Sequence, residues 1–434
     1  MSHPSVSERL HQTRRLLDAE GASGIVLRLR ERAAEALAPH AARPLEVDRA
    51  DLLRAAEIAA GGWVLPDPAP GRPGQPLTVA WVCVPPGVGS GGHTTMFRMV
   101  AALEQAGHTC VVYLHDRHGW DIEQHRQTVR RWWPWVRAEV RDLADGIEDS
   151  HAVLATGWGS AYAVLASPAK GVRCYFVQDF EPAFYPAGSE SLLAEATYRF
   201  GFQGITAGPW LARRLADDYG MPADHFDFGC DLDAYGLEPA VNAARNRTGI
   251  CYYCRPSTPR RAHQLAIATL DLFSERHPEV DIHLYGEPAR SLPFRTIDHG
   301  LMTPAELGVL YNRCIAGLSL SATNVSLVPH ELLAAGAIPV VNDAEHNRMV
   351  LDNPHVVYAP ATPFQLADAL CRLVERPAAQ QAALAHAAAE SVSRKTWEQA
   401  GAQVEMILRR VVETRLADQV AATATATAVS VMPA

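Results

Sequence analysis

The sequence lacks the long hydrophobic segments that would place the chain across a membrane. Its longest nearly apolar stretch, Leu332–Val341, is about half of the ~20 residues that a transmembrane helix needs. The first residues, MSHPSVSERLHQTRR, contain no apolar core of a secretory signal peptide. These two absences predict a cytoplasmic protein.

Positive charge is also scarce. The 434 residues include 39 Lys and Arg against 48 Asp and Glu, which gives a formal net charge of -9. A nucleic-acid surface needs clustered Lys and Arg, so nucleic acid is excluded as the main partner. The 48% hydrophobic and 20% charged residues are typical of a folded protein and argue against disorder. At roughly 150 residues per domain, the length predicts two or three domains.

Few features indicate a metal or redox centre. The 18 His residues form neither an H-x-x-x-H nor an H-E-x-x-H motif. One C-x-x-C exists, Cys251–Cys254, in a strand-like segment where residues three apart point to opposite faces, so the two sulfurs could not share a zinc ion. The 8 Cys are scattered, mostly in apolar runs, which predicts buried free thiols. We therefore predict no metal site and no cofactor.

The chain alternates between predicted strands and helices after a Pro/Gly-rich break at 66–76. Residues 1–60 have apolar residues at helical spacing. The segment 77–84 is a continuous apolar run, typical of a strand buried on both faces, and a Gly-rich loop, a helix and a second strand follow it. A similar series of strands and helices begins at 249.

Two successive series of this kind predict an α/β protein with two Rossmann-like lobes facing a central cleft. The boundaries that we predict are a helical extension and linker at 1–76, a first lobe at 77–236, a second lobe at 237–395, a C-terminal helix crossing back at 396–417, and a flexible tail at 418–434.

The second series carries arginines and small polar residues where ligands bind. Arg255 directly follows an apolar strand, and Arg260 lies in the same loop. Open α/β sheets bind ligands at strand carboxyl ends, and guanidinium groups can grip a diphosphate bidentately. A second loop leads into a helix with Glu331, which could accept hydrogen bonds from sugar or ribose hydroxyls, and which the helix N-terminus would keep ionised. A solvated basic loop and a helix-dipole acid are the structural alternatives.

The first series begins with a Gly-rich loop. Gly87, Gly89 and Gly92 fit G-x-G-x-x-G, the dinucleotide fingerprint, although such a loop suits any phosphate that meets backbone N–H groups. A tight strand-to-helix turn is the alternative interpretation. His93 follows this loop and is a candidate contact for an acceptor.

Three polar residues emerge at the carboxyl end of the strand-like segment VRCYFVQ: Gln178, Asp179 and Glu181. One acid could take the proton of an attacking acceptor hydroxyl, and the other could hold acceptor hydroxyls in position. We favour Asp179, which lies nearer the strand end. A solvated loop with two chance acids is the alternative.

These residues resemble GT-B glycosyltransferases of the large retaining type, glycosyltransferase family 4, over about residues 77–416. In that family an Arg follows a strand of the second lobe and a basic residue comes five positions later, as at Arg255 and Arg260. Two Glu eight positions apart then precede a Pro-Val-Val strand; Glu331 matches the second, and Thr323 holds the place of the first. The segment FDFGCDLDAY is similar to the exit from the first lobe, and VQDFEP with its following aromatics is similar to the rhamnosyltransferase branch.

The resemblance implies metal-independent, retaining transfer of L-rhamnose from dTDP-L-rhamnose to a saccharide acceptor in cell-surface glycan assembly. The cations of the second lobe would take up the charge that grows on the leaving diphosphate. We predict three groups of site residues: Asp179, Glu331 and Arg255 as catalytic; Gly91, Gly92, Arg255, Arg260, Thr323, Asn324, Ser326, Leu327, Val328 and Glu331 for the donor; and His93, Gln178, Asp179 and Glu181 for the acceptor.

Two other functions explain part of the pattern. An NAD-dependent oxidoreductase explains the Gly-rich loop, with Asp116 near the end of the second strand, but not the second lobe with its own Arg and Glu loops. A non-catalytic nucleotide-sugar or glycan-binding module explains both lobes without turnover.

The segment RRWWPWVRAEV at 130–140 allows two interpretations. It could contact a membrane interface near a lipid-linked acceptor, which would place the chain peripherally at the inner membrane face. Packing of its Trp side chains at a lobe surface is the interpretation that we favour. The oligomeric state is left open.

Overall fold

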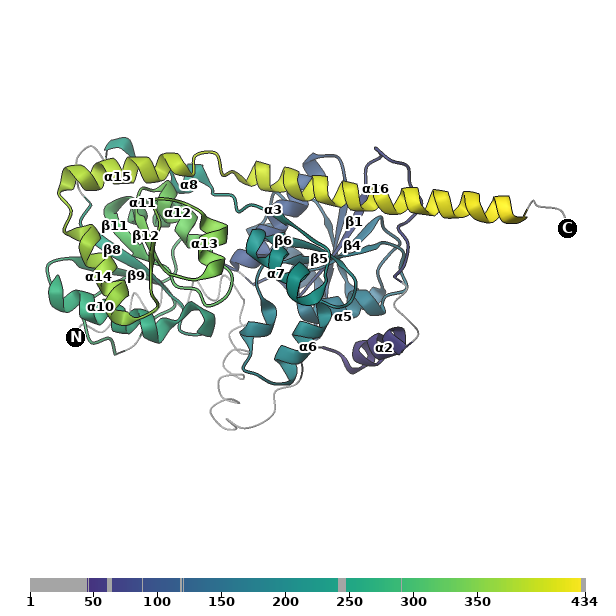
Figure 1. Cartoon of the computed structure of the whole chain (residues 1–434), viewed down its shortest axis with the longest axis horizontal. Helices are drawn as coiled ribbons and strands as arrows, with labels where there is room; N and C mark the ends of the chain where they lie inside the picture. The colour runs from purple at the N-terminus through teal and green to yellow at the C-terminus, as the bar shows by residue number, and fades with distance from the viewer. Residues whose placement is uncertain are drawn as a thin grey trace.

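Two parallel β-sheets, each with its own helices, make up two lobes that lie side by side (Figure 1). The computed structural model describes residues 45–430 except 46, 61–64, 88, 118, 120, 241–246 and 290, and it describes only the backbone of 422–430. The helices predicted before residue 45 therefore lie outside the described residues. Helix α2 (Arg49–Ala60) confirms the end of that prediction, and the break at 66–76 contains neither helix nor strand.

The first lobe is built on a seven-stranded sheet in the order β3-β2-β1-β4-β5-β6-β7, with every neighbouring pair parallel. β1 is buried over nearly all of its length, as its apolar run predicts. The strands are β1 (Thr78–Cys83), β2 (Thr109–Leu114), β3 (Glu139–Asp142), β4 (Ala152–Ala155), β5 (Val172–Val177), β6 (Gln203–Ala207) and β7 (Ala223–Phe226). The helices are α3 (Gly91–Gln105), α4 (Ile122–Trp132), α5 (Trp158–Ala166), α6 (Ser189–Thr197) and α7 (Pro209–Tyr219).

The second lobe has a six-stranded parallel sheet in the order β10-β9-β8-β11-β12-β13, reached through the short helix α8 (Leu232–Tyr235). The part of the predicted linker at 241–246 lies outside the described residues. The strands are β8 (Gly249–Cys254), β9 (Asp281–Gly286), β10 (Ile297–Asp298), β11 (Cys314–Leu318), β12 (Ile338–Asn342) and β13 (Val357–Ala359). The helices are α10 (His263–Arg276), α11 (Pro304–Arg313), α12 (Val328–Ala334), α13 (Glu345–Leu351), α14 (Pro363–Val374) and α15 (Ala378–Ser391).

The C-terminal helix α16 (Trp397–Ser430) returns from the second lobe and runs along the first, where it packs on α3 and β7 (Figure 1). The crossing helix is thus confirmed. Helix α16 continues to Ser430 through the Ala-rich stretch for which the sequence predicted a flexible tail. Alanine has the highest intrinsic helix propensity, which explains the continuation.

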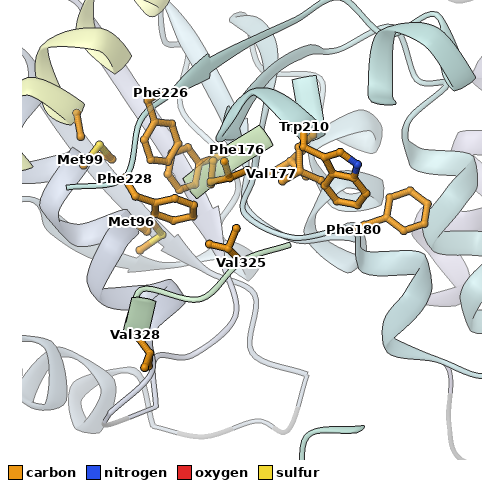
Figure 2. Packing of buried hydrophobic residues seen from close by; sticks show 14 of the residues in the cluster. Met96, Met99, Phe176, Val177, Phe180, Trp210, Phe226, Phe228, Val325 and Val328 are labelled. Carbon is orange, nitrogen blue, oxygen red and sulfur yellow. The ribbon is translucent and has the colours of Figure 1, made fainter. Parts of the chain in front are cut away.

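The lobes meet over an apolar contact that continues the core of the first lobe. Val325, from the loop between β11 and α12, lies among first-lobe residues that include Phe176 and Phe228 (Figure 2). Gly208, which precedes α7, has φ +87°, and a Cβ there would come within 2.9 Å of the Val350 side chain of the second lobe. A glycine therefore allows this close approach of the two lobes.

Two smaller expectations concern the cysteines and the membrane. All 8 Cys are free and buried, as predicted, with Cys251 and Cys254 both in β8. In the part of the chain that the structure describes, no helix combines the length and the apolar character that spanning a membrane requires.

Candidate active site

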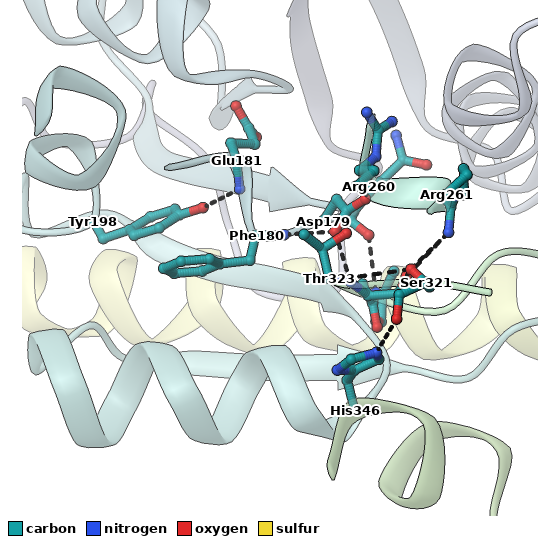
Figure 3. A network of polar contacts seen from close by, with 12 residues as sticks. Asp179, Phe180, Glu181, Tyr198, Arg260, Arg261, Ser321, Thr323 and His346 are labelled. Carbon is teal, nitrogen blue, oxygen red and sulfur yellow. Dashed lines mark hydrogen bonds and ion pairs between the residues drawn. The ribbon is translucent and has the colours of Figure 1, made fainter. Parts of the chain in front are cut away.

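Asp179 is the centre of a polar network where the lobes meet (Figure 3). It follows β5, and its Oδ1 accepts hydrogen bonds from the backbone N–H groups of Phe180 and Asn324, at 2.9 and 2.8 Å. Its Oδ2 lies 3.1 Å from Nε of Arg260 in the second lobe. Because the Asp179 side chain is only 12% exposed, these contacts stabilise its charge far better than a surface pair would. The carboxylate thus joins one strand end to two loops of the other lobe.

Asn324 reinforces this junction from the second lobe. Its side chain is fully buried, and its Nδ2 donates to the carbonyl oxygens of Gln178 and Ala207, at 2.9 and 2.8 Å. These carbonyls lie at the ends of β5 and β6. The group expected to bind the donor's diphosphate is the backbone N–H of Asn324, and in this structure that N–H donates to Asp179.

The Gly-rich loop joins the same network through Gln178, whose Nε2 donates to the carbonyl of Gly92 at 3.0 Å. Gly91 and Gly92 are exposed at the start of α3. The ring nitrogens of His93 lie 2.9 Å from Ser90 Oγ and 3.2 Å from the Val84 carbonyl oxygen, and burial lowers its pKa. His93 is thus a neutral residue that ties its own loop together, and an acceptor would have to break these bonds to reach it.

Glu181, a predicted acceptor contact, is buried and has its partners within the first lobe. It is 6% exposed, and its Oε2 accepts from the backbone N–H of Trp158, the first residue of α5, at 2.6 Å. Its Oε1 accepts from the hydroxyl of Tyr175 at 3.0 Å. A carboxylate at a helix N-terminus stabilises the unpaired N–H groups there, so this acid holds the first lobe together internally.

Arg255 follows β8 and is paired within its own lobe. Its Nε lies 3.0 Å from Oε1 of Glu287, and its Nη1 donates to the Tyr253 hydroxyl at 2.7 Å. Burial alone would lower its pKa, but Tyr253 and Glu287 together raise it. Glu287 in turn accepts from the backbone N–H of Ser257 at 3.0 Å, so this pair is fixed in position.

Arg260 and Arg261 lie in a short 3₁₀ segment between β8 and α10. The guanidinium of Arg260 lies 4.1 Å from the ring centre of Phe184, from the aromatic segment after β5, which adds a cation–π contact to its pair with Asp179. Arg261 points instead into the loop after β11, where its Nη1 donates to Ser321 Oγ at 2.8 Å and to the Asn324 carbonyl at 3.4 Å.

The loop 321–327 is held rigidly on the second lobe. Asn342 exchanges two hydrogen bonds with the backbone of Ser321, at 2.9 and 2.7 Å, and His346 adds a third at 2.9 Å. Thr323 is 2% exposed, and its Oγ1 has no hydrogen-bond partner within the described residues. Of the predicted donor contacts, Ser326 and Leu327 are partly exposed, whereas Val328 is buried in the core. The donor contact predicted for Val328 is therefore one through its backbone N–H.

Glu331 lies in the first turn of α12, in a different environment from the one expected. Its Oε2 accepts from the Tyr311 hydroxyl at 3.4 Å, and Asp231 lies nearby. Burial raises its pKa to about 7, while Tyr311 and Arg98 oppose that rise. The helix N-terminus was expected to lower this pKa, but desolvation outweighs it and the pKa lies above the usual value for Glu.

A chain of tyrosines connects the Arg255 and Glu331 positions. Tyr253 and Tyr285 stack with ring centres 5.1 Å apart, and the hydroxyls of Tyr285 and Tyr311 are 2.7 Å apart. Tyr311 donates to Glu331. Buried tyrosines of the second lobe thus link the positions of Arg255 and Glu331.

Several residues of this arrangement were missed in the sequence. Glu287 directly follows β9, and its place at a strand carboxyl end is the signal that could have found it. Arg98 and Asp231, 3.2 Å apart, are far separated in the chain and carry no local signal. Asp116 is the acid that a dinucleotide site would need. Its carboxylate lies 3.2 Å from His125, and its side chain is only 6% exposed, so it is not accessible to a ribose.

Two other features lie away from this network. A cavity of about 400 Å³ opens at the amino ends of β1, β2 and β3, the opposite end of the sheet from Asp179. Among the described residues, a metal ion could be ligated by a cluster of Asp48, Asp51 and His115. The Nε of Arg117, however, lies 3.4 Å from Asp48 and already compensates the negative charge of that carboxylate.

Comparisons with known proteins agree with this architecture. Residues 248–371 match the family model of the WsaF C-terminal domain. The O-antigen biosynthesis protein RfbC of Myxococcus xanthus is 34% identical over 268 residues, which are 60% of this chain and 20% of that protein. The chain thus spans about a fifth of the length of this curated relative.

Solved structures share the fold at low identity. Anabaena Alr3699/HepE, solved with UDP and glucose, has a TM-score of 0.58 at 14% identity and covers 76% of this chain and 99% of its own. WaaG, a glycosyltransferase involved in lipopolysaccharide biosynthesis, has a TM-score of 0.57 at 13% identity, over 76% and 99% of the two chains. The two parallel-sheet lobes, the crossing helix and these matches identify the chain as a protein with the GT-B glycosyltransferase fold, whose second lobe is similar to the WsaF C-terminal domain.

Proposed function

We propose that the chain is a glycosyltransferase that moves a sugar from a nucleotide-sugar donor to a saccharide acceptor in cell-surface glycan assembly. The observation that carries the proposal is the convergence of Arg255, Arg260 and Arg261 on the second-lobe face that meets the first lobe, beside a preorganised polar loop. The similarity of the second lobe to the WsaF C-terminal domain, and of a longer stretch to an O-antigen biosynthesis protein, supports the same conclusion.

We infer that the donor's diphosphate binds to these arginines and that Glu331 accepts hydrogen bonds from donor hydroxyls. The guanidinium groups are always charged and would stabilise the negative charge that develops on the leaving diphosphate, the role that a metal ion has in other transferases. The donor that we propose is dTDP-L-rhamnose, because the segment VQDFEP resembles the rhamnosyltransferase branch. We propose retention at the transferred carbon because the two lobes resemble the large retaining type. A lipid-linked glycan is one form that the acceptor could take.

The first test is a panel of dTDP-, UDP- and GDP-sugars, with NADH for comparison, in thermal-shift and turnover assays. A ligand at 100 times its Kd adds about 2.7 kcal/mol of stability, so we expect dTDP-L-rhamnose to raise the Tm by a few degrees and to release dTDP when a saccharide acceptor is present. Excess EDTA should leave that release unchanged. A shift with NADH alone would favour an oxidoreductase, and loss of turnover in EDTA would contradict the metal-independent mechanism.

A second prediction concerns the pH dependence of donor binding. Only the ionised form of Glu331 accepts hydrogen bonds at both oxygens, and its pKa is raised to about 7. The KM for the donor should therefore fall as the pH rises from 6 to 8. Glu331→Gln should have a donor KM that is higher at pH 8 and nearly constant over this range. The exposed Glu279→Gln should retain the wild-type profile.

The same pKa shift affects stability with the opposite dependence on pH. Because the folded chain binds the Glu331 proton more tightly than the unfolded chain does, this group's contribution to stability is complete below the unfolded pKa and is lost as the pH rises to about 7. The free energy of unfolding of the wild type should thus decline relative to Glu331→Gln over that interval.

The donor KM tests the binding role separately. A wild-type donor KM that does not change between pH 6 and 8 would remove Glu331 from the donor site.

A further inference from the structure

Arginine and tryptophan are concentrated in residues 126–137, the end of α4 and the loop that follows it, which we call the Arg/Trp segment. The segment holds four arginines and three of the 9 tryptophans of the chain. It contains no Asp or Glu, although the whole chain has a formal net charge of -9. Cations and large aromatic rings are thus gathered at one place on a protein in which acids are in excess.

The middle tryptophan, Trp133, anchors the Arg/Trp segment on α3. It is 3% exposed, its Nε1 donates to Thr94 Oγ1 at 3.1 Å, and its ring centre lies 4.8 Å from that of Phe97. Arg137 fixes the far end of the segment, because its backbone N–H donates to Oε2 of Glu104, also on α3, at 3.0 Å. The packing that the sequence analysis favours for these tryptophans is therefore confirmed for Trp133.

The other two tryptophans of the segment lie at the surface. Trp132 is 37% exposed and Trp135 is 48% exposed. The guanidinium of Arg131 lies 5.5 Å from the ring centre of Trp132, and the side chains of Arg130 and Arg137 are both 71% exposed. Packing within the lobe therefore explains one of the three rings and leaves two of them in water beside exposed cations.

Carboxylates compensate only part of the positive charge of the segment. The two oxygens of Glu123 lie 3.3 Å from Nη1 of Arg130 and 3.5 Å from Nη1 of Arg126, so one acid serves two arginines. The next acid along the chain, Glu139, is paired at 2.7 Å with Arg141, outside the segment. An excess of positive charge therefore remains beside the two exposed rings.

The anchor at Trp133 also determines where this surface lies on the first lobe. Its partner Thr94 directly follows His93, the predicted acceptor contact, in the first turn of α3. The carbonyl of Gly92 accepts from Gln178, which precedes Asp179. The tryptophans of the segment therefore lie beside the end of the first lobe where the candidate acceptor residues gather.

We propose that the Arg/Trp segment binds an anionic membrane surface and holds the first lobe against the bilayer. Negatively charged headgroups attract arginines near the surface, and the amphipathic ring of tryptophan favours the boundary between headgroups and acyl chains. This inference goes beyond the proposed function, because the contact requires neither donor nor acceptor. It would bring the acceptor end of the first lobe close to a saccharide carried on a lipid.

The test is co-sedimentation of the full chain with phosphatidylcholine vesicles and with vesicles of equal parts phosphatidylcholine and phosphatidylglycerol. Wild type should bind the anionic vesicles more tightly than the neutral ones, and added salt should weaken this binding. Arg130→Gln with Arg131→Gln should weaken it by about 10- to 30-fold, because each arginine near an anionic surface contributes about fivefold. Trp132→Ala with Trp135→Ala should weaken it by about 10-fold, through the loss of buried apolar area.

Matched controls separate the segment from the charge and aromatic content of the whole chain. Arg54→Gln with Arg372→Gln removes two exposed arginines elsewhere and changes the net charge equally. Phe364→Ala removes an exposed ring of the second lobe. Both controls should bind the vesicles like the wild type, and all variants should retain the wild-type Tm, since the substituted side chains are exposed.

Three results would overturn the proposal: a wild type without preference for anionic vesicles, segment variants that bind as tightly as the wild type, or controls that lose as much binding as the segment variants. A wild type that binds no vesicles would leave the segment to a protein partner. Turnover of a soluble saccharide acceptor without vesicle binding would contradict this inference alone. Vesicle binding without any turnover would contradict the proposed function and leave the membrane contact standing.

Discussion

Asp179→Asn is expected to lower kcat/KM by about 100-fold or more. The carboxylate accepts from Arg260 and from the N–H of Asn324. In the asparagine variant an NH₂ group faces one of these donors, so an ion pair is lost and two donors oppose each other. A 100-fold loss corresponds to about 2.7 kcal/mol of transition-state stabilisation, the size expected when a positioned proton acceptor is removed.

A double variant distinguishes the two roles that Asp179 could have. Asp179 could act by positioning Arg260 and the loop at Asn324. The loss of kcat/KM in Asp179→Asn with Arg260→Gln should then be smaller than the sum of the losses in the two single variants, because the unpaired charge of Arg260 has been removed. If Asp179 is the base that takes the acceptor's proton, the double variant should have a kcat/KM no higher than that of Asp179→Asn. The fall of kcat at acidic pH should also disappear.

An exposed pair provides the control for this experiment. Asp343 and Arg348 form a similar ion pair in the second lobe, with side chains 35% and 56% exposed. Such pairs contribute little, so Asp343→Asn should leave kcat/KM unchanged. Wild-type kinetics in Asp179→Asn, for both donor and acceptor, would remove Asp179 from the mechanism.

The sequence was sufficient for the two lobes because their strands are local and buried on both faces. The runs at 77–84 and 249–254 lie within or around β1 and β8. Strands with mixed sequence were harder to find. β3 (Glu139–Asp142) has one fully buried residue and β7 (Ala223–Phe226) has one, and both lie at the edges of their sheet, so neither shows an apolar run.

The chemical environment of single residues was much less predictable. Glu181 and Asp179 are two residues apart, yet one caps a first-lobe helix and the other reaches the second lobe. The raised pKa of Glu331 depends on burial beneath other elements, which local spacing does not reveal. Asn324 contacts Asp179 across a separation of 145 residues, and a sequence read alone contains no sign of that pairing.

Arg255→Ala is the second change with a large expected effect. We expect it to cost about 2–4 kcal/mol of transition-state stabilisation, the range for the loss of one electrostatic donor, measured as kcat/KM at saturating acceptor. The loss has two parts, because Arg255 is paired with Glu287. Removing the guanidinium takes one positive charge from the donor site and also exposes the donor to an unpaired carboxylate.

Glu287→Gln separates these two parts. In an Arg255→Ala background it removes the unpaired carboxylate, so kcat/KM should recover in part, although Ser257 still holds the side chain at this position. Alone, Glu287→Gln frees Arg255 from its ion pair, so donor KM should stay the same or fall. Arg255→Lys should fall between wild type and Arg255→Ala, because a lysine supplies the charge but not the bidentate geometry.

The order of these variants decides what Arg255 does. If the diphosphate binds it, activity should rank wild type and Glu287→Gln first, then Arg255→Lys, then the double variant, and Arg255→Ala last. If Arg255 serves only to hold Tyr253, whose hydroxyl lies 2.7 Å from its Nη1, removing Glu287 cannot rescue the alanine variant, and the double variant should be no more active. An unchanged rate in Arg255→Ala would remove this arginine from the donor site, and would leave Arg260 and Arg261 to carry the diphosphate.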